Sequence, residues 1–292
     1  MKACTSCFLA LSALLPLAAH AGDRLLGTGG VTSVEGAGGG GLTPWATIAG
    51  TGSANQTGGV AFATRLETNG RYRLDVVGAA LGWHDRLEVS ASRWTFDLAD
   101  VVPGKTIAMD VLGAKIKVLG DAVYDQDSWV PQVSLGAQYK VNESDALVKS
   151  LGAQSSRGVD VYASATKLWL GAAAGRNVLA SVTTRMTKAN QFGLVGFGGP
   201  RSQAYQLKLE GSVGLMLRDD LVVGAEIRQR PNNLQVDDDA ATLAYKENMA
   251  HDVYIAWFPC RGGSITAAWV NLGNVVSKAD QMGWYLSGQW NF

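Results

Sequence analysis

Twelve segments with the character of β-strands follow one another from Gly58 to the end of the chain. In several of them apolar and polar residues alternate; Leu207 and Leu209, for example, flank Lys208. Successive side chains of a strand point to opposite faces, so each segment has one apolar and one polar face. Most segments have about 9–11 residues or slightly more, as in membrane-crossing strands, whereas soluble strands usually have about 5–6. The segments are 58–66, 72–83, 86–98, 106–118, 129–140, 158–170, 177–189, 204–217, 220–230, 250–259, 263–273 and 283–292.

The connections between these segments alternate in length. The longer ones are 67–71, 99–105, 141–157, 190–203, 231–249 and 274–282, and the shorter ones are 84–85, 119–128, 171–176, 218–219 and 260–262. Only 119–128 is longer than this order predicts. Outer-membrane barrels alternate short periplasmic turns with longer external loops. The sequence therefore predicts an all-β fold, a transmembrane antiparallel up-and-down β-barrel of about twelve strands. Two further strands, 25–35 and 42–50, would make fourteen.

The last ten residues form a strand with one aromatic and apolar face. Trp284, Leu286, Trp290 and the terminal Phe292 share that face. Aromatic rings are frequent at the boundary between membrane and water. The pattern resembles the C-terminal signal of bacterial outer-membrane barrels, so we expect the barrel-assembly machinery and outer-membrane lipid as partners. The alternative is a half-buried strand of a soluble sandwich.

The N-terminus has the features of a secretory signal peptide. Lys2 precedes an apolar stretch from Phe8 to Ala19, and Ala19-His20-Ala21 has the small residues of a cleavage site. We expect cleavage after Ala21 and a location in the cell outer membrane. The mature chain keeps only Cys260, so no intrachain disulfide is predicted. No later stretch has the roughly eighteen uninterrupted apolar residues of a membrane helix.

Residues 22–50 are rich in glycine, and 36–41 read Gly-Ala-Gly-Gly-Gly-Gly. Such a stretch is either a flexible periplasmic linker or a plug threaded into a barrel, where glycine permits close approach of backbones. The predicted organisation is a signal peptide over 1–21, this segment over 22–50 and an outer-membrane barrel over 51–292.

Three local features modify this picture. The alternation slips near Ser92 and near Leu112, which indicates either a β-bulge or a misplaced strand boundary. In loop 141–157, Ser144 is a candidate cap for a short helix over 145–151. Loop 231–249 contains three consecutive aspartates, 237–239, which are either a solvated surface or a cation site.

Charged residues on the polar faces are candidates for the barrel lumen. A charge that faces lipid costs about 2–4 kcal/mol at mid-bilayer, so we expect these residues to point inward. Eight are basic and seven acidic, which fits either a lumen closed by salt bridges or a narrow pore of mixed polarity. The candidates are Arg73, Asp75, Glu88, Asp110, Lys115, Lys117, Lys140, Asp160, Arg185, Lys208, Glu210, Glu226, Arg228, Arg230 and Asp252.

Other functional classes have little support in the sequence. The 25 basic and 25 acidic residues balance, which argues against nucleic acid as a partner. Gly27 and Gly29 lack the third glycine of a dinucleotide fingerprint, and the histidines and Cys260 do not have the spacing of a zinc site. No catalytic constellation, cofactor or metal is therefore predicted. A His251–Asp252 pair at the outer rim leaves a barrel hydrolase as one alternative.

Several short stretches together resemble a family of exported proteobacterial proteins of about 300 residues that carries only a domain-of-unknown-function label. These stretches are 34–45, 120–127, 165–167, 187–191, 196–199 and 230–234. The resemblance spans nearly the whole mature chain and implies an outer-membrane β-barrel, but it implies no activity. From the residues we expect a channel or uptake component for small solutes. The alternative is a closed structural barrel that presents loops 141–157, 190–203 and 231–249 to a partner.

Overall fold

The computed structural model describes residues 26–27, 30–98, 101, 103–235, 245–247 and 249–292. The predicted signal peptide and the aspartates at 237–239 lie outside the described residues.

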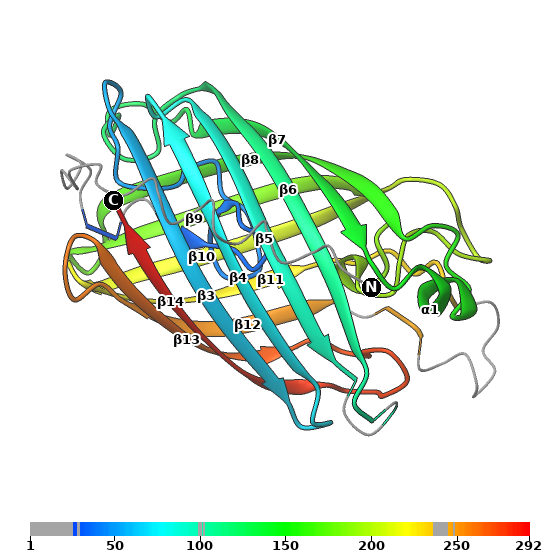
Figure 1. The fold of residues 1–292 in the computed structure, drawn as a ribbon. Coiled ribbons are helices and arrows are strands. Elements are labelled where there is room, and N and C mark those ends of the chain that lie inside the picture. The colour runs from blue at the N-terminus through cyan, green and yellow to red at the C-terminus, as the bar shows by residue number, and fades with distance from the viewer. Residues whose placement is uncertain (1–25, 28–29, 99–100, 102, 236–244, 248) are drawn as a thin grey trace, which may run out of the picture.

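Twelve antiparallel strands form a closed barrel in chain order (Figure 1). Each strand pairs with the next, and the last strand pairs with the first to close the ring. This confirms the predicted all-β barrel of twelve strands. The barrel strands are β3 (Thr57–Thr68), β4 (Arg73–Trp83), β5 (Leu87–Asp97), β6 (Thr106–Leu119), β7 (Gln132–Asn142), β8 (Arg157–Ala173), β9 (Arg176–Thr187), β10 (Gln206–Arg218), β11 (Leu221–Arg228), β12 (Ala250–Trp257), β13 (Gly263–Asn271) and β14 (Met282–Asn291).

The two candidate extra strands do not join the barrel. β1 (Val31–Thr32) and β2 (Gly38–Gly39) pair with each other in a small sheet that is separate from the barrel, and Gly39 also bridges to Pro44. The fourteen-strand alternative is therefore wrong. Two-residue strands with a tight glycine-containing turn between them are too short to span a wall, so this stretch folds back on itself.

The two ends of the barrel differ in their connections. The turn end carries the C-terminus and short connections, apart from the longer connection 120–131 between β6 and β7. The loop end carries most of the longer connections together with α1 (Asp145–Ser150) and η1 (Asn190–Gly193) (Figure 1). The predicted short helix is present as α1, with Ser144 in the capping position but without a side-chain capping bond. Among the described residues, no helix is long and apolar enough to cross a membrane.

The outer wall carries large exposed apolar side chains. They include Val182, Val213 and Val253 at mid-strand, and Trp284, Leu286 and Trp290 on β14. The β14 side chains share one face, as the alternation predicts. Phe292 extends the seam, because its backbone exchanges hydrogen bonds of 2.7 and 2.9 Å with Gly59 next to the pairing of β14 with β3.

The strands near Ser92 and Leu112 contain no bulge. β5 pairs with β6 without a register shift at either residue, and the shifts that do occur lie at Lys117/Leu119, Trp169/Ala173 and Met216/Arg218. What changes is the chemistry of the two faces. Toward the loop end of β5 and β6 the inward residues become apolar, as with Trp94, Phe96, Ile107 and Met109.

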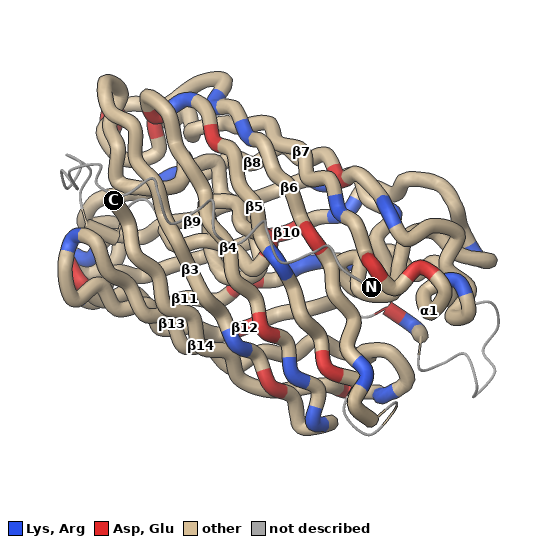
Figure 2. The backbone as a smooth tube through the Cα atoms, in the orientation of Figure 1, with Lys and Arg blue, Asp and Glu red and all other residues tan. Residues whose placement is uncertain are grey.

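On the same part of the wall the outward residues become charged, which corrects three predictions. Arg73, Asp75 and Asp110 lie on the outer face rather than in the lumen. There they form exposed ion pairs, including Arg65–Asp75 at 2.6 Å and Arg93–Asp110 at 2.8 Å. Figure 2 shows charged positions gathered toward the loop end of β3–β6, at the lower side of the view. The rule that charges point inward fails here because this part of the lumen is packed as an apolar core.

A stretch that we call the inner segment, residues 30–50, lies inside the barrel (Figure 1). Every residue from Val31 to Ala49 is buried. Val34, Leu42 and Trp45 belong to the apolar core that also contains Trp94 and residues of the loop end. The lumen is therefore filled by a separate stretch of chain, in addition to the side chains of its own wall.

Candidate functional site

The contact between the inner segment and the barrel wall centres on Glu35. This residue lies between β1 and β2 and is completely buried. It meets three basic side chains from alternate strands, Lys140 on β7, Arg185 on β9 and Arg228 on β11. We call these three residues the basic clamp. Side chains that point inward from alternate strands of a barrel lie in one layer, so these three residues reach the same point of the lumen.

The geometry around Glu35 is that of a bound carboxylate. Arg228 donates from both terminal nitrogens, at 2.9 Å each, one to each carboxylate oxygen. Lys140 Nζ lies 2.5 Å from Oε1, and an Arg185 terminal nitrogen lies 3.4 Å from Oε2. A planar guanidinium that contacts two oxygens at once matches the shape of a carboxylate, which a point charge does not.

Two wall carboxylates complete the cluster. Asp160 lies 2.7 Å from Lys140 and 3.6 Å from Arg185, and Glu210 lies 2.5 Å from Arg185 and 3.3 Å from Arg228. Three cations therefore face three carboxylates, of which Glu35 is the only one not supplied by the wall. All of these side chains are at most 4% exposed, so each charge depends on its partners for stabilisation.

The pKa of Glu35 reflects this surrounding. Burial opposes ionisation of the carboxyl group, but Arg228, Lys140 and Arg185 together outweigh burial. They hold the pKa of Glu35 well below its usual value, so Glu35 is ionised at neutral pH.

A second set of polar contacts binds backbone groups of Gly38, Trp45 and Ala49 in the inner segment. Glu88 on β5 accepts hydrogen bonds from the backbone N–H of Gly38 at 3.1 Å and of Ala49 at 2.7 Å. Lys115 on β6 pairs with Glu88 at 2.9 Å and donates to the carbonyls of Gly38 at 2.9 Å and Trp45 at 3.2 Å. One ion pair of the wall thus replaces the hydrogen bonds that these backbone groups would make to water.

Glu226 on β11 holds the glycine-rich turn. It accepts from the Leu42 N–H at 2.7 Å and from the Thr43 hydroxyl at 2.5 Å. A methyl group on Gly40 would overlap the Glu226 carboxylate, and one on Gly41 would overlap the Tyr285 hydroxyl. Glycine at both positions therefore lets the backbone approach these two wall side chains closely.

Hydroxyl and amide groups of the wall bind the remaining backbone of the segment. The Ala46 carbonyl accepts from Gln132 at 2.6 Å and Ser134 at 2.5 Å, and the Ala46 N–H donates to Thr166 at 2.8 Å. The Pro44 carbonyl accepts from Thr183 at 2.8 Å. The mid-lumen face of the wall is therefore polar, and its partners come from the inner segment.

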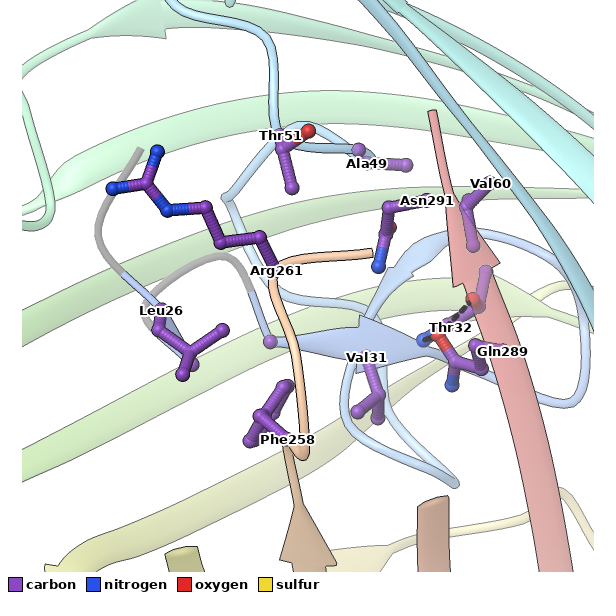
Figure 3. Close-up of a pocket in the computed structure, with 13 residues that line it drawn as sticks. Leu26, Val31, Thr32, Ala49, Thr51, Val60, Phe258, Arg261, Gln289 and Asn291 are labelled. Atoms are coloured by element: carbon purple, nitrogen blue, oxygen red, sulfur yellow. Dashed lines mark hydrogen bonds between the residues drawn. The ribbon is translucent and has the colours of Figure 1, made fainter. Parts of the chain in front are cut away.

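The turn end of the segment borders a small cavity (Figure 3). Val31, Ala49 and Phe258 line it, and Thr32 donates from its N–H and hydroxyl to Gln289 at 3.1 and 2.7 Å. The cavity has a volume of about 40 Å³. That is room for a few water molecules and too little for a solute.

The loop end is closed by residues 189–199, which we call the cover loop. All of its residues are buried. Phe192 has a left-handed backbone with φ of 65°, an uncommon and costly conformation for a residue with a side chain. Its ring lies 4.6 Å from the Arg228 guanidinium and its carbonyl accepts from Lys140 at 3.1 Å. The cover loop thus contacts the basic clamp from the side opposite to the turn end.

Most of the predicted lumen residues face the interior. Glu88, Lys115, Lys140, Asp160, Arg185, Glu210, Glu226, Arg228, Arg230 and Asp252 are buried. Lys117 contacts Asp85 and Asp121 at the turn end, Lys208 is half-buried near the loop end, and Arg230 pairs with Glu247 at 3.1 Å. Asp252 lies opposite Glu226 in the β11–β12 register, and among the described residues neither has a cationic partner.

The strand geometry contradicts the alternative of a hydrolase with a His251–Asp252 pair. His251 is exposed on the outer face and Asp252 is buried on the inner face. Neighbouring residues of one strand point in opposite directions, so the two cannot form a catalytic pair. Within the described ranges, no three His, Cys, Asp or Glu side chains gather in a way that could hold a metal ion.

The prediction of lumen residues missed Glu35, the residue on which the site centres. A signal was present in the sequence, because Glu35 is the only charged residue between Arg24 and Arg65. A single carboxylate in an otherwise uncharged, glycine-rich stretch indicates a specific partner.

Comparisons with known proteins agree with the barrel. A family model described as "Protein of unknown function (DUF3034)" matches residues 28–289. No curated protein matches the sequence.

Several solved structures are similar in fold. The KdgM porin is 9% identical with a TM-score of 0.51, and the match covers 80% of this chain and 99% of that chain. The KdgM porin in complex with disordered oligogalacturonate gives a TM-score of 0.50 at the same identity and coverage. The COG4313 outer membrane channel from Pseudomonas putida F1 is 14% identical, covers 83% and 97% of the two chains, and has a TM-score of 0.47. At such identities the likeness concerns the fold alone.

Proposed function

This chain belongs to the DUF3034 family, and we propose that it is an outer-membrane channel for small solutes whose lumen the inner segment closes. One observation carries the proposal, namely that the contact between the inner segment and the mid-lumen wall is polar on both sides. Glu88, Lys115, Gln132, Ser134 and Thr166 all bind backbone groups of the segment.

The polar wall supports an inner segment that can leave the lumen, because its hydrogen bonds to the wall can be replaced by water. Water can replace hydrogen bonds to carbonyl and N–H groups at small net cost, since each such bond contributes only about 0.5–1.5 kcal/mol. A barrel with a purely structural role needs no hydratable wall, because apolar side chains fill an interior more cheaply than buried charges do. After displacement, the mid-lumen would therefore be a water-filled passage lined by charged and hydroxyl groups.

The covalent attachment of the segment supports the same conclusion. Residues 51–56 join it to β3 at the turn end, and these residues are exposed or half-buried. The barrel closes by pairing of β14 with β3, without any contribution from the inner segment. The segment can therefore move toward the turn end while every hydrogen bond between barrel strands stays in place.

Location in the outer membrane is part of the proposal. The exposed apolar residues of the mid-wall, such as Val213 and Val253, suit a lipid environment. The outward Trp284 and Trp290 on the closing strand suit both the interface and recognition during barrel assembly.

The cover loop favours a second candidate, a closed barrel that meets a partner through its loops. The cover loop closes the loop end independently of the inner segment. The Asn142 amide donates to the Leu194 carbonyl at 2.8 Å, and Gln191 accepts from the Val276 N–H at 2.8 Å. In this second candidate the cover loop stays closed when the inner segment leaves, so the barrel does not conduct.

Single-channel conductance of the refolded mature protein separates the two candidates. We expect rare or no openings for the full mature chain and frequent steps for a variant that lacks residues 22–50. Heat-modifiable mobility in gel electrophoresis serves as the control that both barrels are folded. Silence of both folded proteins would contradict the channel and favour the closed barrel.

A further inference from the structure

Around Glu35, the barrel wall carries one more positive charge than negative charges. Among the wall groups within ion-pair distance, the basic clamp supplies three positive charges, and Asp160 and Glu210 supply two negative charges. The sixth member, Glu35, comes from the inner segment. If the inner segment leaves, the wall site that remains lacks one negative charge.

The donors of this site are held in position by wall and loop residues as well as by Glu35. Arg185 also donates to Gln138 at 2.8 Å, and its guanidinium lies 5.1 Å from the Tyr162 ring. Arg228 is flanked by Glu210 at 3.3 Å and by the Phe192 ring. The site is therefore preorganised for a planar group with two oxygens and a single negative charge, which is a carboxylate.

An apolar space adjoins the carboxylate position. A cavity of about 30 Å³ lies between the inner segment and the cover loop. Its lining includes Val34 and Leu42 of the segment, Trp94 and Phe96 of the wall, and Phe192 of the cover loop. Departure of the segment would add the volumes of Val34 and Leu42 to this cavity. Gln191 and Arg230 are the polar members of an otherwise apolar lining. Phe192 connects this space to the basic clamp, because its ring lies 4.6 Å from the Arg228 guanidinium.

We propose that Val34 and Glu35 occupy the binding site of a solute, a monocarboxylate with an apolar body, which competes with Glu35 for the basic clamp. This inference rests on the proposed channel function and names its solute class. Glu35 takes the place of the solute carboxylate and Val34 takes the place of part of its apolar body. Binding of the solute would therefore release the inner segment.

Benzoate is a suitable probe, and benzamide is its neutral counterpart of almost the same shape. Hydrogen exchange of peptides from residues 30–50 reports release of the segment in the full mature chain. We expect benzoate to accelerate this exchange at least ~10-fold more than benzamide at the same concentration. In Glu35→Gln, which removes the competing charge, we expect the benzoate concentration for half-maximal effect to fall by about tenfold or more. In Arg228→Gln, the benzoate effect should disappear.

Glu143→Gln is the matched control. Glu143 also pairs with an arginine, Arg93 at 2.5 Å, but on the exposed outer wall. This variant should respond to benzoate as the unmodified protein does. Equal effects of benzoate and benzamide in both the unmodified protein and Glu35→Gln would overturn the inference.

Conductance measurements on Glu35→Gln distinguish failure of the carboxylate site from failure of the channel. Frequent openings without any preference for benzoate over benzamide would leave the channel intact and remove the carboxylate site. Benzoate-dependent release of residues 30–50 without conductance would retain the site and contradict the channel.

Discussion

Arg228 and Glu35, which are 193 residues apart in the chain, form a two-pronged ion pair at 2.9 Å for each contact. The pair joins the inner segment to β11 at a point that water does not reach, since Glu35 is completely buried. Loss of one partner would leave the other charged and buried, and such losses typically cost about 3–5 kcal/mol. This relationship leads to the first two predictions.

Arg228→Lys should loosen the inner segment although it keeps the charge. Lysine cannot contact both oxygens of Glu35 in one plane and cannot stack on Phe192 as the guanidinium does. We expect retention of the segment to weaken by about 1–3 kcal/mol, measured as faster hydrogen exchange at residues 30–50. Arg93→Lys is the matched control, because Arg93 also contacts two carboxylates, Asp110 and Glu143, but on the outer wall. Unchanged exchange in Arg228→Lys would contradict the prediction.

Acid should release the inner segment only well below neutral pH. The basic clamp holds the pKa of Glu35 below the ordinary value of 4.5, against the effect of burial. Its ion pairs therefore contribute full stability above about pH 4.5 and lose it as the pH falls through the lower, folded pKa. Asp160 and Glu210 contact the same clamp from the barrel wall.

We therefore expect hydrogen exchange at residues 30–50, corrected for its intrinsic pH dependence, to stay constant from about pH 8 to about pH 5 and to rise in stronger acid. Release between about pH 7 and about pH 5 would show that a group other than Glu35 controls the segment.

Glu247 should give the loop end the opposite dependence on pH. Burial raises the pKa of Glu247 to about 7, although Arg230 and the Gln191 N–H lower it. Because the folded state then binds the proton more tightly than the unfolded state, the stability contributed by this group is greatest below about pH 4.5. It decreases as the pH rises toward about 7.

We expect Glu247→Gln to reduce the difference in unfolding free energy between about pH 5 and about pH 8, as measured by urea titration in detergent micelles. An unaltered pH profile in this variant would be inconsistent with the prediction.

Gly40→Ala should weaken the hold on the glycine-rich turn. The added methyl group would overlap the carboxylate of Glu226, which accepts from Leu42 and Thr43. Overpacking of a filled interior costs about 1–3 kcal/mol, so we expect faster exchange at residues 30–50 and more frequent channel openings. Gly288→Ala on β14 is the control, because nothing lies within 4 Å of the added methyl group. Equal behaviour of the two variants would refute this account.

The outer wall should tolerate charge changes at its loop end and not at mid-strand. Arg73 pairs with Asp75 at 3.3 Å and is nearly half exposed, so Arg73→Ala should change stability by only about 0–1 kcal/mol. Val213 is exposed in the middle of β10, where V213R should cost about 2–4 kcal/mol in a lipid bilayer. Urea unfolding in lipid vesicles gives both values. Similar costs for the two variants would place the membrane boundary elsewhere on the wall.

Local patterns in the sequence were sufficient for the barrel itself. Alternation in stretches such as 204–217 depends only on the two-residue period of a strand, and long and short connections depend only on the order of strands around a ring. Both properties belong to short stretches of chain, so the strands, their order and the short helix after Ser144 follow from the sequence, as do the inward positions of residues such as Lys140 and Arg185.

Tertiary structure decided how the lumen is filled, and with it the position of several charges. Arg73, Asp75 and Asp110 face outward because Trp94, Phe96 and the cover loop make the loop end of the lumen an apolar core. Glu35 is buried because three strands that are distant in the sequence place their basic side chains at one height. A strand's period states which residues share a face, but only the occupant of the lumen determines which face excludes water.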